Sequence, residues 1–515
     1  MGSDVFPGLS LRKIHVKEKE AFTVDSTVSK IHSEIVVDEP VTPAGRLFMQ
    51  EEMNVYILCT LAFVNPIDVP EFKKTMIATI VNHKRFHSII SKDKKGNDVW
   101  VPVDVQIDDH VVVPTVDKAA PRYVEDYITD LALAPPLDVS RPMWEFHVLN
   151  GTESGEDGAT AHMIMRVHHA LGDGTSLMSL MLACTRRLGK PDELPAVPVA
   201  RVRVKEKKSL FRQMLGLLFL FWNTLVGIFL FTSTAIWLKD SDSVIKGHFG
   251  VEKEKKKLVY QSIDMTDMSI VKNAVNGTIN DVLMGMVSES VRLYLEDRYA
   301  TDSSPIKQAG GKEGQAEAVD MKKVASHVEK LRIRACALMN TRATPGLQEL
   351  ASMMDGGSQH RWGNHMGYLL IDIPLKHQLD PLENVIAAKK YTDRKKSSLE
   401  GIFTYWSGAM LMAFTGPTLP LILTRRVILQ TTLTVSNVPG PTEPVTFGGN
   451  PIVGIFPIVS GHPQSLSIYL QTYNGKANLV VMSAKSVLPD PEKLLNLMID
   501  SLKNMVKAAK AKGSN

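Results

Sequence analysis

Runs of apolar residues with strand-like or helix-like spacing divide most of the chain into short elements. Two runs rich in β-forming residues, at 55–63 and 162–168, predict strands in the first part of the chain, and the runs at 331–340 and 433–437 predict strands in the second part. Helical spacing predicts helices over 71–86, 382–397 and within 265–299. Strands mixed with helices in both parts predict a mixed α/β (α+β) fold.

Breaks in this pattern predict the domain organisation. Residues 1–38 are polar and form an N-terminal extension, and residues 39–200 form a first α/β half. Residues 201–257 begin with a basic stretch, continue into an apolar one, and link the first half to a second half at 258–515. Within the second half we expect a mobile loop at 301–329, because the composition of 301–320 cannot form a core.

Charge and cysteine content exclude several classes of function. A net charge of +4 over 515 residues, without a basic stripe carrying interleaved aromatics, gives no support for nucleic-acid binding. The three cysteines, Cys59, Cys184 and Cys336, each lie in an apolar run, which is typical of small buried hydrophobic residues in a reducing compartment. The histidines lack metal-ligand spacing, so no metal site is expected.

The sequence RVHHALGDGTSL at 166–177 joins the end of the second predicted strand to a predicted helix that extends to about Leu188. Asp173 or Thr175 can cap this helix, and Gly189 follows its end. His168, His169 and Asp173 therefore lie on a strand-to-helix turn, where a rigid scaffold can present side chains to a pocket.

Histidine on such a turn is suited to removing the proton of a hydroxyl that attacks an acyl group. The ring needs a fixed tautomer, and two arrangements could provide it. Asp173 could bind the second ring nitrogen directly, or it could pair with an arginine and leave a backbone carbonyl to orient the ring. The non-functional interpretation is an ordinary core or surface histidine.

The segment HHALGDG (168–174) matches the HHxxxDG signature of the wax ester synthase/diacylglycerol acyltransferase family, of the bifunctional type found in bacteria and plants. Five further segments resemble blocks of that family in the same order: EPVTPAGRLF (39–48), PLDVSRPMWEFHVL (136–149), GTINDVLMGMVSESVRLYL (277–295), NHMGYLLIDIPL (364–375) and TVSNVPGP (434–441). The similarity extends over roughly residues 39–510.

The resemblance implies two halves like chloramphenicol acetyltransferase, with a channel between them. It implies an acyl-CoA-dependent O-acyltransferase in which His169 is the general base, His168 supports the turn and Asp173 is structural. Gly174 is expected to let the backbone approach closely. The co-substrate would be acyl-CoA and the acceptor a long-chain alcohol or diacylglycerol, with membrane lipid as a further partner and no bound cofactor.

The same resemblance singles out Asn280 and Asp281 in the second half. Asn280 is a candidate donor to the developing oxyanion, with a helix N-cap as the alternative, and Asp281 would support it. The segment at 39–48 reads Val-Thr-Pro where the family often has Leu-Ser-Pro, and 301–320 resembles an insertion. We expect neither departure to touch the catalytic turn.

The uncharged stretch 214–238 is long enough to cross a bilayer as one helix. A single crossing would place His169 and Asn280 on opposite sides of the membrane, so a returning hairpin, an interfacial helix or a buried helix is expected instead. Gly216 and Gly227, with polar residues between them, offer a possible bend. A membrane-associating insertion is favoured over a buried helix. The expected location is the endoplasmic reticulum membrane with the site facing the cytosol, and the plasma membrane is an alternative.

Two other functions remain open. A soluble plant acyltransferase of the BAHD type also uses HxxxD, but the chain lacks a DFGWG segment and has the apolar insertion. A non-catalytic lipid-binding protein on the same fold has no need of a base, so the intact His169 and Asp173 speak against it.

Overall fold

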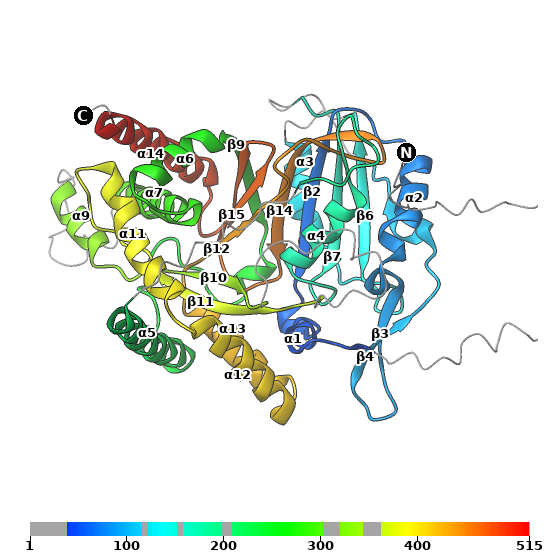
Figure 1. Cartoon of the computed structure of the whole chain (residues 1–515), viewed down its shortest axis with the longest axis horizontal. Coiled ribbons are helices and arrows are strands. Elements are labelled where there is room, and N and C mark those ends of the chain that lie inside the picture. The colour runs from blue at the N-terminus through cyan, green and yellow to red at the C-terminus, as the bar shows by residue number, and fades with distance from the viewer. Residues whose placement is uncertain are drawn as a thin grey trace, which may run out of the picture. The chain divides into compact units, whose positions relative to one another are not determined.

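Two large β-sheets carry the fold (Figure 1), and the computed structural model describes residues 39–115, 122–151, 158–196, 209–301, 320–342 and 362–513. The predicted extension at 1–38 lies outside the described residues, and residues from Pro40 onward form one compact unit. β1 (Glu39–Pro40) is the first described strand, and β3 (Ser88–Lys92) pairs antiparallel with β4 (Asp98–Pro102) outside the two large sheets.

The first sheet has seven strands, in the spatial order β5 (Val111–Val112), β6 (Trp144–Asn150), β7 (Ala161–His168), β2 (Tyr56–Phe63), β14 (Asn450–Ser460), β13 (Val445–Phe447) and β8 (Arg186–Arg187). Every residue of β2 and β7 is buried, because both faces of the sheet are covered. The strands predicted at 55–63 and 162–168 are confirmed.

The second sheet has six strands, in the order β11 (Met366–Asp372), β10 (Arg334–Asn340), β12 (Leu433–Val438), β15 (Leu466–Tyr473), β16 (Lys476–Ala484) and β9 (Lys256–Asp264). β10, β12 and β15 run parallel, and the other pairs are antiparallel. The strands predicted at 331–340 and 433–437 are confirmed.

A β-hairpin from the second predicted half completes the sheet of the first half. β13 and β14 belong to 258–515 by sequence, yet they complete the first sheet, with Ile455 opposite Leu61 and Ile458 opposite Leu58 on β2. β2 is buried on both faces, so the backbone groups on its second edge need a partner strand. Residues 258–515 therefore contribute strands to the first sheet as well as forming most of the second.

Twelve helices are described, and their bounds are α1 (Pro43–Phe48), α2 (Val69–Ala78), α3 (Tyr123–Leu131), α4 (Gly174–Cys184), α5 (Leu210–Ile236), α6 (Met265–Ala274), α7 (Ile279–Thr301), α9 (Met321–Glu329), α11 (Pro381–Lys396), α12 (Glu400–Thr415), α13 (Thr418–Leu429) and α14 (Pro491–Gly513). The helices α6, α7, α11 and α14 cover the second sheet, and α2 and α4 lie against the first (Figure 1). A separate apolar cluster, including Leu58, Ile164, Phe456 and Val480, fills the space between the sheets.

Several predicted element boundaries were wrong. The helix expected over 71–86 ends at Ala78 and is followed by two 3-10 turns, Ile80–Asn82 and Lys84–His87. Residues 321–329, predicted as part of a mobile loop, form α9, because Val324 and Val328 on one face are buried; residues 302–319 lie outside the described residues. The three cysteines are buried and free, as predicted.

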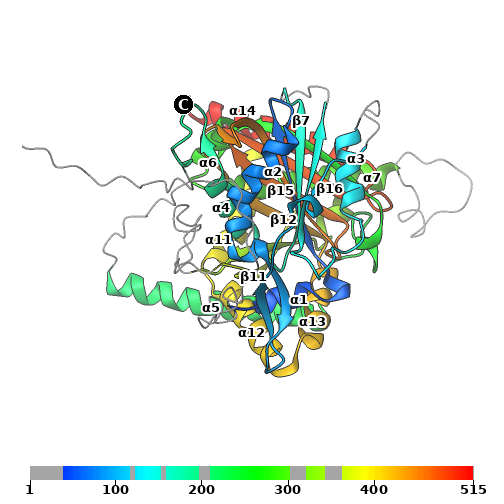
Figure 2. The ribbon, with the colours of Figure 1, turned by 90° about the vertical axis from the view of Figure 1, so that its right-hand side faces the viewer.

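The apolar insertion forms one continuous helix of 27 residues, α5, so the possible bend and the returning hairpin are not formed. Most of its N-terminal residues are exposed, and Figure 2 shows the helix extending outward from the sheets. The polar residues that suggested a bend bind the protein instead: Asn223 Nδ2 donates to Ser397 O at 3.3 Å, and Thr224 Oγ1 accepts from Leu399 N at 2.9 Å. α5 is long and apolar enough to cross a membrane, which is weak evidence for membrane association.

Candidate functional site

The predicted catalytic turn begins where β7 ends. Side chains alternate along β7, so His168 faces the same side as Ile164, toward the space between the sheets. His169 is the first residue of the turn, its backbone N–H donates to Val55 O at 2.8 Å, and Leu171 N closes the turn on His168 O at 3.0 Å. The predicted strand-to-helix turn is confirmed.

Asp173 caps α4 through a hydrogen bond from Ser176 N at 2.9 Å. The helix ends at Cys184, four residues before the predicted Leu188, because Thr185 is extended and Arg186 and Arg187 pair as β8. The prediction that Asp173 or Thr175 caps this helix is therefore resolved in favour of Asp173.

His169 is buried, with 3% of its surface exposed, and its Nδ1 lies 3.0 Å from Asn364 Oδ1. The amide nitrogen of Asn364 donates to His169 O at 2.8 Å and lies 3.4 Å from Ala170 O. Because that amide faces two carbonyls, the Asn364 oxygen must accept from the ring, which places the ring proton on Nδ1. Nε2 is left with its lone pair, the form that a general base requires.

Burial lowers the pKa of His169 below its ordinary value of 6.5, so the ring is neutral at neutral pH. The ring of Phe48, the last residue of α1, packs against it with 4.5 Å between the centroids. A neutral, fixed and desolvated imidazole can take a proton from a hydroxyl more readily than one that is already charged.

His168 has the opposite tautomer and a different environment. Its Nδ1 accepts from Ala170 N at 3.1 Å, and its Nε2 donates to Asn54 Oδ1 at 3.1 Å. Burial lowers its pKa to about 3. Both ring nitrogens are occupied by structural hydrogen bonds, as expected of a residue that supports the turn.

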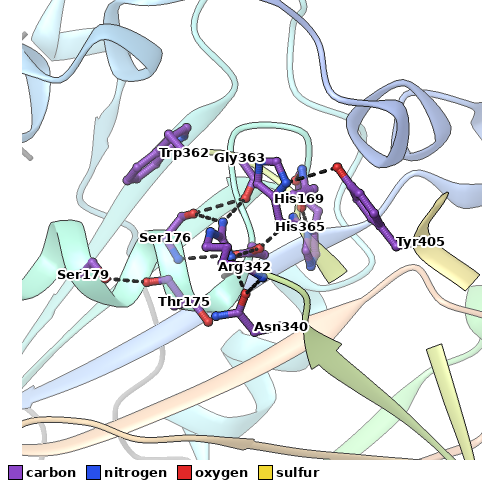
Figure 3. Close-up of polar contacts among 12 residues, drawn as sticks. His169, Thr175, Ser176, Ser179, Asn340, Arg342, Trp362, Gly363, His365 and Tyr405 are labelled. Atoms are coloured by element: carbon purple, nitrogen blue, oxygen red, sulfur yellow. Dashed lines mark hydrogen bonds and ion pairs between the residues drawn. The ribbon is translucent and has the colours of Figure 1, made fainter. Parts of the chain in front are cut away.

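Among the described residues, no hydrogen bond joins Asp173 to the His169 ring. Asp173 instead pairs with Arg342, whose Nη1 lies 2.8 Å from Asp173 Oδ2. The Nη2 of Arg342 donates to Ser176 Oγ at 2.8 Å and to Gly363 O at 2.7 Å (Figure 3). Of the two arrangements left open by the sequence, the pairing with arginine is the one formed. The group that orients the ring is the Asn364 side chain, not the backbone carbonyl that was expected.

Four consecutive residues of the second half, 362–365, hold the turn; we name them the clasp. Trp362 Nε1 donates to Leu171 O at 2.6 Å, Gly363 O accepts from Ser176 Oγ, and Asn364 binds His169. His365 N donates to Asp173 Oδ2 at 3.0 Å. Only Asn364 and His365 fall within a segment that the sequence comparison singled out, and nothing in their spacing predicted their role.

The segment 39–48 does touch the catalytic turn, contrary to the prediction. Thr42 caps α1 with a hydrogen bond from Gly45 N at 3.2 Å, and this places Gly45 and Phe48 against the turn. A Cβ on Gly45 would lie 3.4 Å from Ala170 O and 3.0 Å from Thr42 Oγ1. The other departure, at 301–320, lies almost wholly outside the described residues.

Gly174 shows no close approach that requires glycine among the described residues. A Cβ on it would lie 3.5 Å from Val438 Cγ2, an ordinary contact. The crowded glycine of the turn is Gly172, where a Cβ would lie 3.2 Å from the Ser176 Cβ and 3.3 Å from the Trp362 ring.

Asn280 and Asp281 lie at the start of α7. Asn280 is exposed, and its Oδ1 accepts from Asn437 Nδ2 of β12 at 2.6 Å. It is not the N-cap: Thr278 takes that role, since its Oγ1 accepts from Asp281 N at 3.3 Å while Asp281 Oδ2 accepts from Thr278 N at 2.8 Å. The oxyanion role of Asn280 stays a prediction.

Asp281 is fully buried and structural. Burial raises the pKa of its carboxyl, but hydrogen bonds from Thr392, Lys396 and Thr278 outweigh that effect and lower it. Lys396 Nζ lies 2.9 Å from Asp281 Oδ1, so this carboxylate joins α7 to α11.

A cavity of about 380 Å³ lies next to the turn, between α1, β11, α12, α13 and the C-terminal part of α5. Phe48 is one of its walls, so the cavity ends one side chain away from His169. Its volume is within the range of small-molecule sites.

Comparisons with known proteins cover most of the chain. Residues 62–283 match the family model described as the wax ester synthase/diacylglycerol acyltransferase catalytic domain, and residues 362–506 match the WS/DGAT C-terminal domain. The chain is 36% identical over 492 residues to wax ester synthase/diacylglycerol acyltransferase 11 of Arabidopsis thaliana, covering 93% of this chain and 97% of that protein.

Two solved structures share the fold. The wax ester synthase/diacylglycerol acyltransferase of Marinobacter aquaeolei VT8 matches with a TM-score of 0.55 at 16% identity, over 92% of this chain and 100% of that one. The first condensation domain of the CDA synthetase matches with a TM-score of 0.53 at 14% identity, over 92% and 96%. The predicted fold class, two chloramphenicol-acetyltransferase-like halves, is confirmed.

Proposed function

Because the chain belongs to the wax ester synthase/diacylglycerol acyltransferase family, we propose that it transfers a fatty acyl group from acyl-CoA to a hydroxyl of a long-chain alcohol or of diacylglycerol. The observation that carries the proposal is the neutral His169, whose tautomer is set by Asn364 so that Nε2 accepts a proton.

The reaction needs one base and no covalent acyl-enzyme. His169 Nε2 takes the proton of the acceptor hydroxyl as its oxygen attacks the thioester carbonyl. The tetrahedral intermediate collapses by breaking the carbon–sulfur bond, and the protonated Nε2 returns the proton to the departing sulfur. The products are the ester and free CoA. Asn280 is the proposed donor to the oxyanion.

Burial of the base supports transfer over hydrolysis. The ring of His169 is shielded by Phe48 on one side and bound by Asn364 on another, so bulk water has little access to it. A site that excludes water protects the thioester until an acceptor hydroxyl arrives.

The membrane association that we propose is monotopic. α5 joins the protein at both ends: Ala196 N, before it, donates to Glu443, and Leu238 O, after it, accepts from the buried Arg334. If α5 crossed a bilayer, the twelve residues 197–208, which include five lysines and arginines, would have to return through the hydrocarbon. An interfacial position avoids this cost.

Exposed apolar side chains on three neighbouring helices support the same position. On α5 they include Leu217 and Phe221, each 64% exposed, on α12 Phe414 at 82%, and on α13 Ile422 at 55%. We name this surface the apolar face. Exposed apolar patches of this kind are typical of membrane-binding surfaces. The proposed location is the endoplasmic reticulum membrane, with the site on the cytosolic side, where acyl-CoA is available.

The test is ester formation with competing acceptors. Membranes or vesicles containing the protein are incubated with labelled palmitoyl-CoA, hexadecanol and diacylglycerol, and the labelled esters are separated. We expect ester and free CoA in equal amounts when an acceptor is present, and little CoA release without one. His169→Ala should reduce ester formation by at least about 1000-fold, since the reaction loses its base.

The matched control is His248→Ala. It removes an exposed histidine that is distant from His169 in the sequence and pairs with Glu254. It should retain wild-type turnover. Saturable binding of lipid without release of CoA would instead support a lipid-binding protein, and near-wild-type turnover by His169→Ala would falsify the assignment of the base.

A further inference from the structure

The cavity beside the catalytic turn has a wholly uncharged lining. None of its described lining residues is Asp, Glu, Lys, Arg or His; apart from Gly408 they carry aliphatic, aromatic, thioether or hydroxyl-bearing side chains. The phosphates of coenzyme A would find no cationic partner there, at a high cost in desolvation. A hydrocarbon chain carries no charge and would avoid that cost.

The exposed residues of the cavity lining lie on α5, one of the helices of the apolar face, and indicate that the cavity opens there. Thr232 and Ile236 of α5 line the cavity and are also exposed, Ile236 by 51%. α12 separates two surfaces: Tyr405, Gly408 and Met412 line the cavity, whereas Trp406 and Phe414 are exposed on the apolar face. A molecule dissolved in the membrane can therefore reach the mouth without crossing water.

The inner end of the cavity reaches the catalytic machinery at two points. Phe48 lines the cavity and packs on the His169 ring. Tyr405 lines it too, and its hydroxyl lies 3.1 Å from His365 Nδ1, in the clasp (Figure 3). Residues of the cavity lining therefore contact both His169 and the clasp that orients it.

We propose that this cavity holds the hydrocarbon chain of the membrane-dissolved acceptor alcohol, which enters between α5, α12 and α13 and presents its hydroxyl toward His169. The proposal rests on the transferase activity proposed above and adds the path and the binding site of one substrate. The C-terminal part of α5 then has a second role besides membrane contact, because it forms one wall of a substrate site.

Gly408 gives a direct test. A Cβ on Gly408 meets no atom within 4 Å, so a larger side chain there would enter the cavity without a clash at its base. Displacing one buried methylene of a ligand costs about fourfold in affinity, so a phenylalanine that displaces two or more should cost at least about tenfold. The matched control is Gly216→Phe, on α5, where a Cβ is equally unobstructed but does not line the cavity.

The kinetic experiment compares hexadecanol in phosphatidylcholine vesicles with hexanol, using palmitoyl-CoA. We expect Gly408→Phe to lower kcat/KM for hexadecanol at least about tenfold, with hexanol turnover and the KM for palmitoyl-CoA within about twofold of wild type. Gly216→Phe should leave all three unchanged. A loss that is equal for both alcohols, or a changed preference for acyl-CoA chain length, would overturn the proposal; the latter would assign the cavity to the acyl chain.

A binding readout separates this proposal from the proposed function. The three native cysteines are buried, so the thiols of Gly408→Cys and Gly216→Cys can be followed by maleimide labelling. Hexadecanol in vesicles should slow labelling at 408 and not at 216, even in a preparation without turnover. Equal labelling of Gly408→Cys with and without hexadecanol overturns the cavity assignment, whereas absence of ester with every acceptor contradicts only the proposed function.

Discussion

Asn364 orients the ring of His169, the proposed base, and its replacement tests the central geometry of the site. Asn364→Ala removes the acceptor 3.0 Å from His169 Nδ1 and the donor to His169 O. A buried donor left without a partner costs about 1–3 kcal/mol, and the ring is then free to take the wrong tautomer. We expect kcat to fall about 10- to 100-fold, since each 1.4 kcal/mol corresponds to a factor of ten.

Asn364→Asp gives the more specific result, because it keeps an oxygen acceptor and adds a charge. A carboxylate beside the imidazole stabilises its protonated form, so the pKa of His169 should rise. The base works only when neutral, and its rate is lost as the pH falls through that pKa. In the wild type, burial lowers the pKa of His169 below 6.5, so activity should persist below pH 6.5. In Asn364→Asp the acidic limb should move to higher pH.

The assay is the initial rate of CoA release with saturating palmitoyl-CoA and hexadecanol, from pH 5 to pH 8.5. A structural defect alone would lower the rate at every pH without moving the limb. The explanation of the base would be refuted if Asn364→Ala kept at least half of kcat, or if the acidic limb of Asn364→Asp coincided with that of the wild type.

Two further predictions concern the second half and the membrane. Arg342→Ala leaves the carboxylate of Asp173 buried without its cation, so the free energy of unfolding should fall by about 3–5 kcal/mol and thermal unfolding should begin several degrees lower. Arg187→Ala, at an arginine that is 42% exposed and pairs with Glu193 and Glu443, should cost much less. Equal melting curves for both variants would contradict the role of Arg342. The double variant Leu217→Glu, Phe221→Glu replaces two exposed residues of α5 and should weaken vesicle binding at least about 100-fold in a sedimentation assay. The control Leu379→Glu, at a residue that is 96% exposed and lies outside the apolar face, should leave vesicle binding unchanged. A double variant that still sediments with vesicles would show that another surface binds them.

The sequence was sufficient for elements whose pattern is local. The strands β2 and β7 are runs rich in β-forming residues, and the turn between β7 and α4 has its own signals in His168, His169 and Asp173. The groups that complete the site lie far along the chain: Asn364 is 195 residues from His169, and Arg342 is 169 residues from Asp173. Neither the spacing of residues nor their periodicity can predict such contacts, because the packing of the two sheets brings these residues together.

The errors have the same cause. The pairing of β13 and β14 with the first sheet could not be predicted. The residue pattern of a strand shows which of its faces is apolar, but not which sheet edge lacks a partner strand. The possible bend in α5 was inferred from Gly216 and Gly227 with polar residues between them, whereas two of those polar residues, Asn223 and Thr224, bind the segment before α12. A polar residue in an apolar helix can mark a contact as well as a bend.

β11 connects α12, one of the helices of the apolar face, to the residues that hold His169. This strand begins two residues after Asn364, and at Gly367 it touches α12 so closely that a Cβ would lie 1.9 Å from Gly401 O. Tyr368 N donates to Thr404 Oγ1 of α12 at 2.9 Å, which fixes the same contact. α12 in turn carries residues of both the cavity and the apolar face. A displacement of α12 on membrane binding would therefore be transmitted to the clasp over a few residues of one strand. Since Asn364 of the clasp sets the tautomer of His169, the cavity proposed for the acceptor and the proposed base are connected through α12 and β11.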